Sequence, residues 1–195
     1  MLDLRLGRLT LRFGFSFFLL MAVLLVWDRD RLVLPVLLAV ILHELGHLTA
    51  MLLCGVGVRG VCCTGSGVHI LPGWHKKGGM IRELTVHLAG VAVNFLMAGL
   101  FFLFPMGFYG AYFSLINLLL GCFHLIPAGN LDGANALRCL LSRYCSEAVT
   151  RRWMRLVSTG CLGLLLWQML RAASMLNFSA MILWCYLLIC TVREY

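Results

Sequence analysis

The chain has 195 residues, of which 62% are hydrophobic and only 12% are charged. With a mean hydropathy of +0.94, this composition excludes an ordinary soluble domain and predicts a polytopic membrane protein embedded in a lipid bilayer. The formal net charge of +8 does not indicate nucleic-acid binding, because basic residues of membrane proteins gather in their cytoplasmic loops.

Six apolar segments follow one another along the chain. A membrane-spanning helix needs about 20 residues, so six spans leave no room for a separate soluble domain. The first segment is not followed by a small-residue cleavage site, and we interpret it as a retained helix rather than a signal peptide. We therefore expect an all-α polytopic protein with one membrane-embedded domain over residues 1–195. The expected spans are about 13–27, 32–54, 83–104, 111–126, 156–170 and 178–192.

Residues 55–80 interrupt the series of apolar segments. Glycines recur between short β-prone pieces such as Val56 to Cys63 and Val68 to Leu71. This spacing, with its β-branched residues, favours a short hairpin or a membrane-surface loop between the second and third spans. A flexible connector fits the same composition equally well. If a hairpin forms, its edge is expected to receive an extended substrate segment by β-addition.

Basic residues alternate along the links between the expected spans. The N-terminal arm, the second link and the fourth link are basic, whereas the other links are neutral or nearly so. Six spans with both termini in the cytoplasm require this alternation. The residues that carry it are Arg5, Arg8 and Arg12, then Arg59, Lys76, Lys77 and Arg82, then Arg138, Arg143, Arg151, Arg152 and Arg155.

The second expected span contains ionisable residues at bilayer depth. Its sequence Leu42-His43-Glu44-Leu45-Gly46-His47 is an H-E-x-x-H motif. A charged residue in the middle of a span costs about 2.5–3.5 kcal/mol by insertion scales, and such residues are kept mainly where they do chemistry. His43 and His47 lie four residues apart, so they share one helix face and can bind one metal ion.

The predicted topology brings a third donor to the same side of the membrane. Asp132 follows the fourth span at its cytoplasmic end, and His47 lies in the cytoplasmic half of the second span. Catalytic zinc usually has three protein ligands and an open position for water. We therefore predict a zinc-dependent hydrolase, open to the cytoplasm, with His43, His47 and Asp132 as ligands. Glu44 is the expected general base toward a zinc-activated water.

Four further histidines lie outside the H-E-x-x-H motif. His69 and His75 lie in the expected loop and are interpreted as solvated, and His87 as interfacial. His124 lies in the fourth span, eight residues before Asp132. It can be a metal ligand, a hydrogen-bond donor to the substrate or a satisfied core histidine.

These motifs resemble those of the site-2 protease family of intramembrane zinc metalloproteases. That family pairs H-E-x-x-H in one span with a late N-x-x-P-x-x-x-L-D-G, and residues 43–47 match the first motif fully. The resemblance implies an intramembrane endopeptidase with Zn2+ as its cofactor and a membrane-associated protein as its substrate. The other matching residues are Pro127, Leu131, Asp132 and Gly133 in the late motif, and Ala89-Gly90-Val91-Ala92-Val93-Asn94, which resembles the family's A-G-P-x-x-N.

Three positions depart from the family pattern without removing a ligand or the base. His124 replaces the asparagine of the late motif, Asn130 replaces the proline before Leu-Asp-Gly, and Val91 replaces the proline after Ala-Gly. In the family that this chain resembles, the asparagine of the late motif is proposed to assist the scissile carbonyl. His124 or Asn94 is the expected replacement as a contact to the substrate or its oxyanion.

The short six-span form is most similar to the sporulation type of this family, the stage IV sporulation protein FB group. That similarity implies a membrane-associated pro-sigma factor as the substrate. Two other functions use the same polar residues. An ion or metal transporter would use them as an ion path, although a symmetrical pair of broken helices is missing. An inactive relative would bind and sequester membrane clients.

Overall fold

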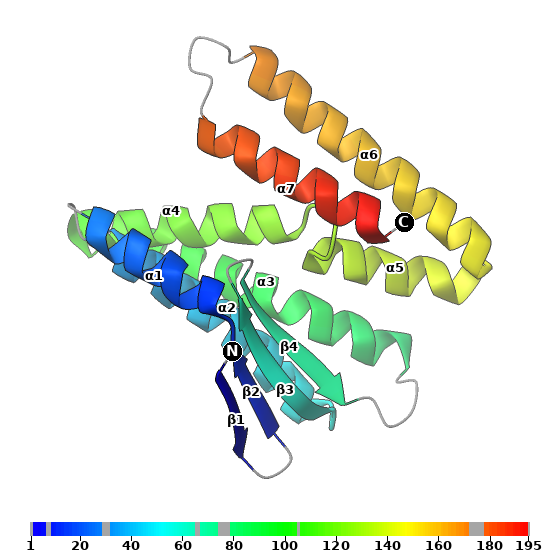
Figure 1. The fold of residues 1–195 in the computed structure, drawn as a ribbon, viewed down its shortest axis with the longest axis horizontal. Coiled ribbons are helices and arrows are strands. Elements are labelled where there is room, and N and C mark those ends of the chain that lie inside the picture. Colours follow the sequence, from blue (N-terminus) through cyan, green and yellow to red (C-terminus); the bar gives the residue numbers. More distant parts are fainter. Residues whose placement is uncertain are drawn as a thin grey trace. The chain divides into compact units, whose positions relative to one another are not determined.

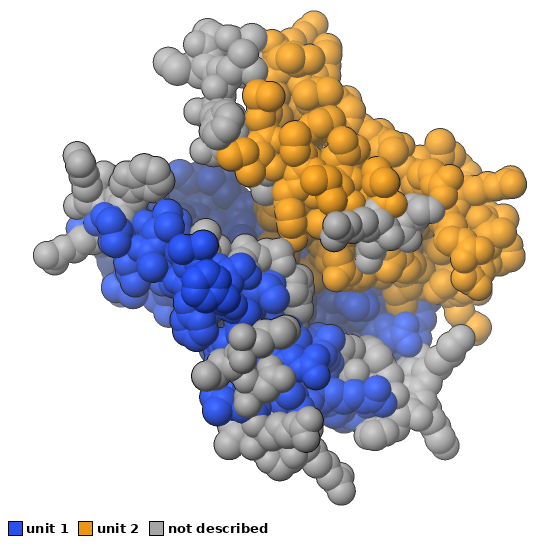
Figure 2. Space-filling view, viewed as in Figure 1, with its two compact units in different colours: residues 1–121 blue, residues 122–195 orange. Residues whose placement is uncertain are grey.

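A computed structural model describes residues 2–6, 9–28, 32–64, 67–73, 79–104, 106–171 and 178–194 of the chain. The fold is mostly helical, with one small sheet (Figure 1). The chain divides into two compact units, residues 1–121 and residues 122–195 (Figure 2). The elements are β1 (Leu2–Leu6), β2 (Leu9–Phe13), α1 (Phe15–Trp27), α2 (Val33–Leu53), β3 (Gly57–Thr64), β4 (Gly67–Gly73), α3 (Met80–Leu103), α4 (Gly107–His124), α5 (Asp132–Tyr144), α6 (Glu147–Arg171) and α7 (Phe178–Glu194).

The first unit contains a four-stranded sheet, so the all-α expectation is wrong for this part of the chain. The strand order is β1-β2-β3-β4. β3 and β4 form an antiparallel hairpin, which is one of the two interpretations of residues 55–80. The sequence reading missed the N-terminal hairpin β1–β2, although its leucines alternate with polar residues at the period of a strand. β2 then joins β3 in parallel, with Thr10 opposite Gly60.

Helices α2 and α3 pack closely within the first unit. A Cβ atom at Gly46 would lie 2.9 Å from the Ala89 carbonyl oxygen and from Val93 Cγ2, so only glycine permits this approach. In the described part of the chain, these are the two helices long and apolar enough to cross a membrane. α1 has 13 residues, which makes it about 20 Å long against a hydrocarbon core of about 30 Å. The six-span topology therefore stays a prediction.

The second unit consists of α5, α6, α7 and the loop that precedes α5. Its core contains Ala128 from that loop, Leu162 from α6 and Leu187 from α7. Hydrogen bonds hold the loop in place. Ser158 Oγ donates to the Pro127 carbonyl oxygen at 2.6 Å, and the Gly129 N–H donates to Thr191 Oγ1 at 3.1 Å. The loop before α5 is thus attached to both long helices of its unit.

Two helical segments lie outside the expected spans because they are amphipathic rather than apolar. α5 lies in the expected link between the fourth and fifth spans, and it buries Ala134, Ala136 and Cys139. α6 begins at Glu147, nine residues before the expected start of the fifth span. Its early turns carry arginines on the outside, whereas Thr150, Met154, Ser158 and Leu162 form a buried face at four-residue intervals.

Candidate metal centre

Two buried imidazoles meet on the face of α2 that packs against α3. His43 is 1% exposed and His47 is 8% exposed, and their Nε2 atoms lie 3.1 Å apart. Two nitrogens bound to one tetrahedral zinc at about 2.0–2.1 Å would lie about 3.3 Å apart. The 3.1 Å spacing of the two nitrogens is therefore compatible with binding of a single ion, and the ligand role of the two histidines stays a prediction.

A backbone carbonyl of α3 orients the second of these rings. His47 Nδ1 lies 2.7 Å from the carbonyl oxygen of Val86. A carbonyl oxygen only accepts hydrogen bonds, so Nδ1 carries the proton. In the neutral ring, Nε2 then keeps its lone pair and points toward His43. This second contact is the usual way in which proteins hold a metal-binding histidine in the correct tautomer.

Gly90 on α3 provides the space in front of both imidazoles. A Cβ atom at this position would lie 2.5 Å from His47 Nε2 and 2.8 Å from His43 Nε2. Both distances are far below van der Waals contact, so any larger residue would displace the rings. The Ala-Gly motif alone does not predict that Gly90 leaves space for the imidazoles, because the contact between α3 and the histidines is a tertiary contact.

Glu44 lies between the histidines in sequence and is half-buried. Its negative charge contributes to the electrostatics at Cys63 on strand β3. Burial, and then the negative charges of Cys62 and Glu44, raise the pKa of the Cys63 thiol above its ordinary value.

Asn94 lies one turn after Gly90 on α3 and is 0% exposed. Among the described residues, no group forms a hydrogen bond with either atom of its side-chain amide. A buried polar group left without a partner costs about 1–3 kcal/mol. The role of Asn94 as a contact to the substrate stays a prediction.

In the second unit, His124 and Asp132 form a pair. His124 Nδ1 donates to Asp132 Oδ2 at 2.9 Å, and the two side chains are 23% and 14% exposed. Asp132 is the first residue of α5, where the helix dipole also favours a carboxylate. The preceding loop brings Gly133 close to the Leu125 carbonyl. A Cβ atom at Gly133 would overlap that carbonyl, so glycine is required there.

The sequence reading did not predict the pairing of His124 with Asp132. The hydrogen bond to the Asp132 carboxylate satisfies one of the His124 ring nitrogens, so the three alternatives given for His124 stay predictions. His87, which was expected at the interface, is half-buried on α3. His75 and the side chain of His69 lie outside the described residues.

Comparisons with known proteins found similarity both in sequence and in fold. No family model matches the chain. A curated zinc metalloprotease of Methanocaldococcus jannaschii is 35% identical over 114 residues, covering 54% of this chain and 32% of that protein. The chain thus spans about a third of its curated relative's length. A solved site-2 protease from the same organism superposes with a TM-score of 0.71 at 20% identity, covering 99% of this chain and 94% of the other. The chain therefore has the fold of that site-2 protease.

Proposed function

We propose that the chain belongs to the site-2 protease family and is an intramembrane zinc metalloprotease. Its proposed substrate is a membrane-associated protein, in which it hydrolyses a peptide bond. One observation carries the proposal: two histidine Nε2 atoms lie 3.1 Å apart on a helix that is long and apolar enough to cross a membrane. The fold and the curated relative, a zinc metalloprotease, support it.

The proposed zinc ligands are His43, His47 and Asp132. Two imidazoles and one carboxylate form a donor set that suits zinc and leaves the fourth position open. The hydrogen bond from His124 supports this role for Asp132, because ligating carboxylates are usually held by such a partner. A bound zinc ion would lower the pKa of a coordinated water toward neutrality.

Glu44 is the proposed general base. Its carboxylate would take a proton from the attacking water and pass it to the amide nitrogen that leaves. Asn94 is the proposed donor to the scissile carbonyl oxygen, since its buried amide has no hydrogen-bond partner in the described part of the chain. His124 is proposed to act on the substrate through Asp132, which its Nδ1 contacts at 2.9 Å.

The substrate is proposed to bind in an extended form along β4. A peptide bond inside a helix is shielded by its hydrogen bonds, so it must unwind before attack. β4 is the last strand in the order β1-β2-β3-β4, and an edge strand can add a further strand through backbone hydrogen bonds. Proline in place of Val68 on β4 should reduce cleavage, while alanine there should not. Unchanged cleavage in the proline variant would exclude β-addition.

The proposed topology has six spans, cytoplasmic termini and an active site open to the cytoplasm. The alternation of basic links supports it. The proposed substrate class within this family is a pro-sigma factor of sporulation, on the resemblance of the expected six-span arrangement to the sporulation type. Reporter fusions at each link test the topology, and co-expression with a pro-sigma factor tests the substrate.

The decisive experiment compares the wild type with Glu44→Gln. Each protein is reconstituted in vesicles with zinc and a candidate membrane substrate, and both cleavage and bound zinc are measured. Loss of cleavage with zinc retained supports the protease. Ion flux without cleavage would instead indicate a transporter, and tight substrate binding without cleavage in either protein would indicate a sequestering relative.

A further inference from the structure

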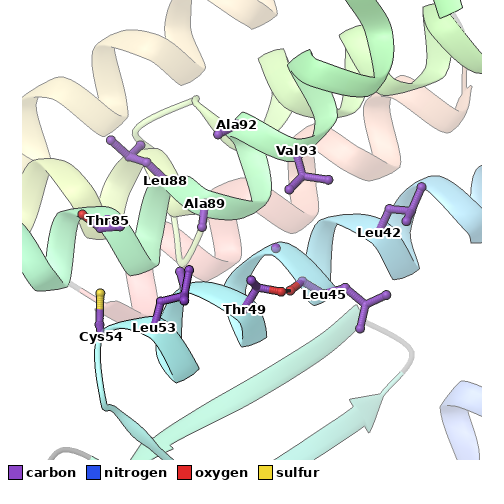
Figure 3. Close-up of a pocket in the computed structure, with 12 residues that line it drawn as sticks. Leu42, Leu45, Thr49, Leu53, Cys54, Thr85, Leu88, Ala89, Ala92 and Val93 are labelled. Atoms are coloured by element: carbon purple, nitrogen blue, oxygen red, sulfur yellow. Dashed lines mark hydrogen bonds between the residues drawn. The ribbon is translucent and has the colours of Figure 1, made fainter. Parts of the chain in front are cut away.

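An apolar groove of about 610 Å³ lies between α2 and α3 in the first unit. Figure 3 shows side chains from both helices lining it. Leu45 and Thr49 line the α2 side, and Thr85, Leu88 and Ala92 line the α3 side. The histidines of the candidate metal centre are not among its lining residues. The groove is therefore a feature separate from that centre.

The polar groups that line the groove are already used within their own helices. Thr49 Oγ1 donates to the Leu45 carbonyl oxygen, and Thr85 Oγ1 donates to the Ile81 carbonyl oxygen, both at 2.8 Å. No described hydroxyl in the groove keeps a proton for a ligand. The occupant that fits such a lining is hydrocarbon.

A cationic side chain lies at one end of the groove. A Cβ atom at Gly55, next to the lining residue Cys54, would lie 3.7 Å from Arg82 Nη2. Arg82 is exposed and precedes Thr85 by three residues, so both lie on one side of α3. Among the described residues, no carboxylate pairs with its guanidinium.

The carbonyl groups at the C-terminal end of α2 do not bind the Arg82 guanidinium in the described part of the chain. The helix closes with Gly55 in the left-handed region, at φ 64°. The N–H groups of Cys54, Gly55 and Val56 donate to the carbonyls of Ala50, Leu52 and Met51 at 2.7–3.1 Å. The last carbonyls are thus satisfied by the helix's own turn, and the Arg82 guanidinium stays available.

We propose that the groove binds an anionic phospholipid, with an acyl chain between α2 and α3 and the phosphate at Arg82. The site rests on the proposed membrane location of these helices, but not on protease activity. Guanidinium binds phosphate oxygens in pairs. A helix of 18 residues occupies roughly 2,000 Å³, so the groove is matched to a lipid chain rather than to a substrate helix.

Native mass spectrometry of the full-length protein in detergent tests the proposal. Phosphatidylglycerol and phosphatidylcholine with identical acyl chains are added in equal amounts. The wild type should retain phosphatidylglycerol preferentially, and Arg82→Gln should reduce that preference about fivefold, as one lost basic residue near an anionic surface predicts. Arg143→Gln, at an exposed arginine of α5, is the charge control and should change nothing.

A second variant tests the groove itself. Ala92→Phe fills it and should remove both lipids. Leu96→Phe, one turn further on α3 at a side chain that is 64% exposed and outside the groove, should retain them. Equal retention of both lipids, unaffected by Arg82→Gln, would overturn the proposal, as would a dimer that Ala92→Phe dissociates. Cleavage is assayed separately, so failure of the lipid site and failure of the protease give different results.

Discussion

At the scale of single residues, the space in front of the two histidines depends on Gly90. We expect Gly90→Ala to weaken zinc binding about 10–100-fold, the range found when the groups that orient a metal ligand are disturbed. The reason is steric, because the new methyl carbon would lie 2.5 Å from His47 Nε2. Zinc titration of the purified protein measures the effect.

Gly99→Ala is the matched control for this variant. It lies on the same helix, and a Cβ atom there would meet no atom within 4 Å. Both variants gain the same helix propensity, so only steric contact with the histidines separates them. Equal zinc affinity in the two variants would show that Gly90 does not shape the metal centre.

His124 is predicted to act through Asp132. His124→Leu removes the hydrogen bond to Asp132 Oδ2 and should weaken zinc binding about 10–100-fold. His124→Asn should recover most of the loss, because its amide N–H can donate to the same oxygen. If asparagine and leucine weaken zinc binding equally, the hydrogen bond is not what orients Asp132. A separate readout, the Michaelis constant for substrate, should change little in His124→Asn.

These residues also mark how far the sequence could predict the site. The spacing of His43 and His47 is local to one helix, so its consequence could be read directly from the helical period. Gly90 acts across two helices, and the His124–Asp132 pair forms across an irregular loop. Neither contact follows from a repeating pattern in the sequence, so both could be found only in the three-dimensional structure.

At the scale of elements, the parallel junction of β2 and β3 holds the N-terminal hairpin onto the sheet. A Cβ atom at Gly60 would lie 2.6 Å from the Thr10 carbonyl oxygen, which is backbone and cannot turn aside. Gly60→Ala should therefore destabilise the protein by about 1–3 kcal/mol, the usual cost of overpacking. Chemical denaturation followed by circular dichroism measures this, with Gly79→Ala, which meets no atom within 4 Å, as control.

The proximity of Glu44 to β3 gives a second prediction at this scale. Burial raises the pKa of the Cys63 thiol most, followed by the charge of Cys62, and the Glu44 charge is the smallest of the three causes. Glu44→Gln removes that charge, so the Cys63 pKa should fall and its thiolate should form at lower pH. The pH dependence of Cys63 alkylation, followed by peptide mass spectrometry, measures the shift. An unchanged profile would mean that Glu44 does not face the sheet.

Elements with strong hydrophobic patterns were predictable, whereas those stabilised by tertiary contacts were not. α2 and α3 lie within three residues of their expected bounds because their apolar runs are long. β1 and β2 are five residues each, and the pairing of β2 with β3 joins segments that α1 and α2 separate in the sequence. α5 was missed because its buried face consists of small residues, Ala134 and Ala136, whose hydropathy signal is weak.

At the scale of the whole molecule, binding of zinc by the proposed ligands His43, His47 and Asp132 should be coupled to folding. A ligand that binds only the folded state stabilises it by about 2.7 kcal/mol at 100 times its dissociation constant. Zinc should therefore raise the thermal midpoint of the wild type, and a chelator should lower it. Asp132→Ala should lose most of this response, whereas Glu147→Gln, at an exposed acid of α6, should keep it. An equal zinc response in Asp132→Ala would place the third ligand elsewhere, because removing a true ligand must reduce the binding free energy that is coupled to folding.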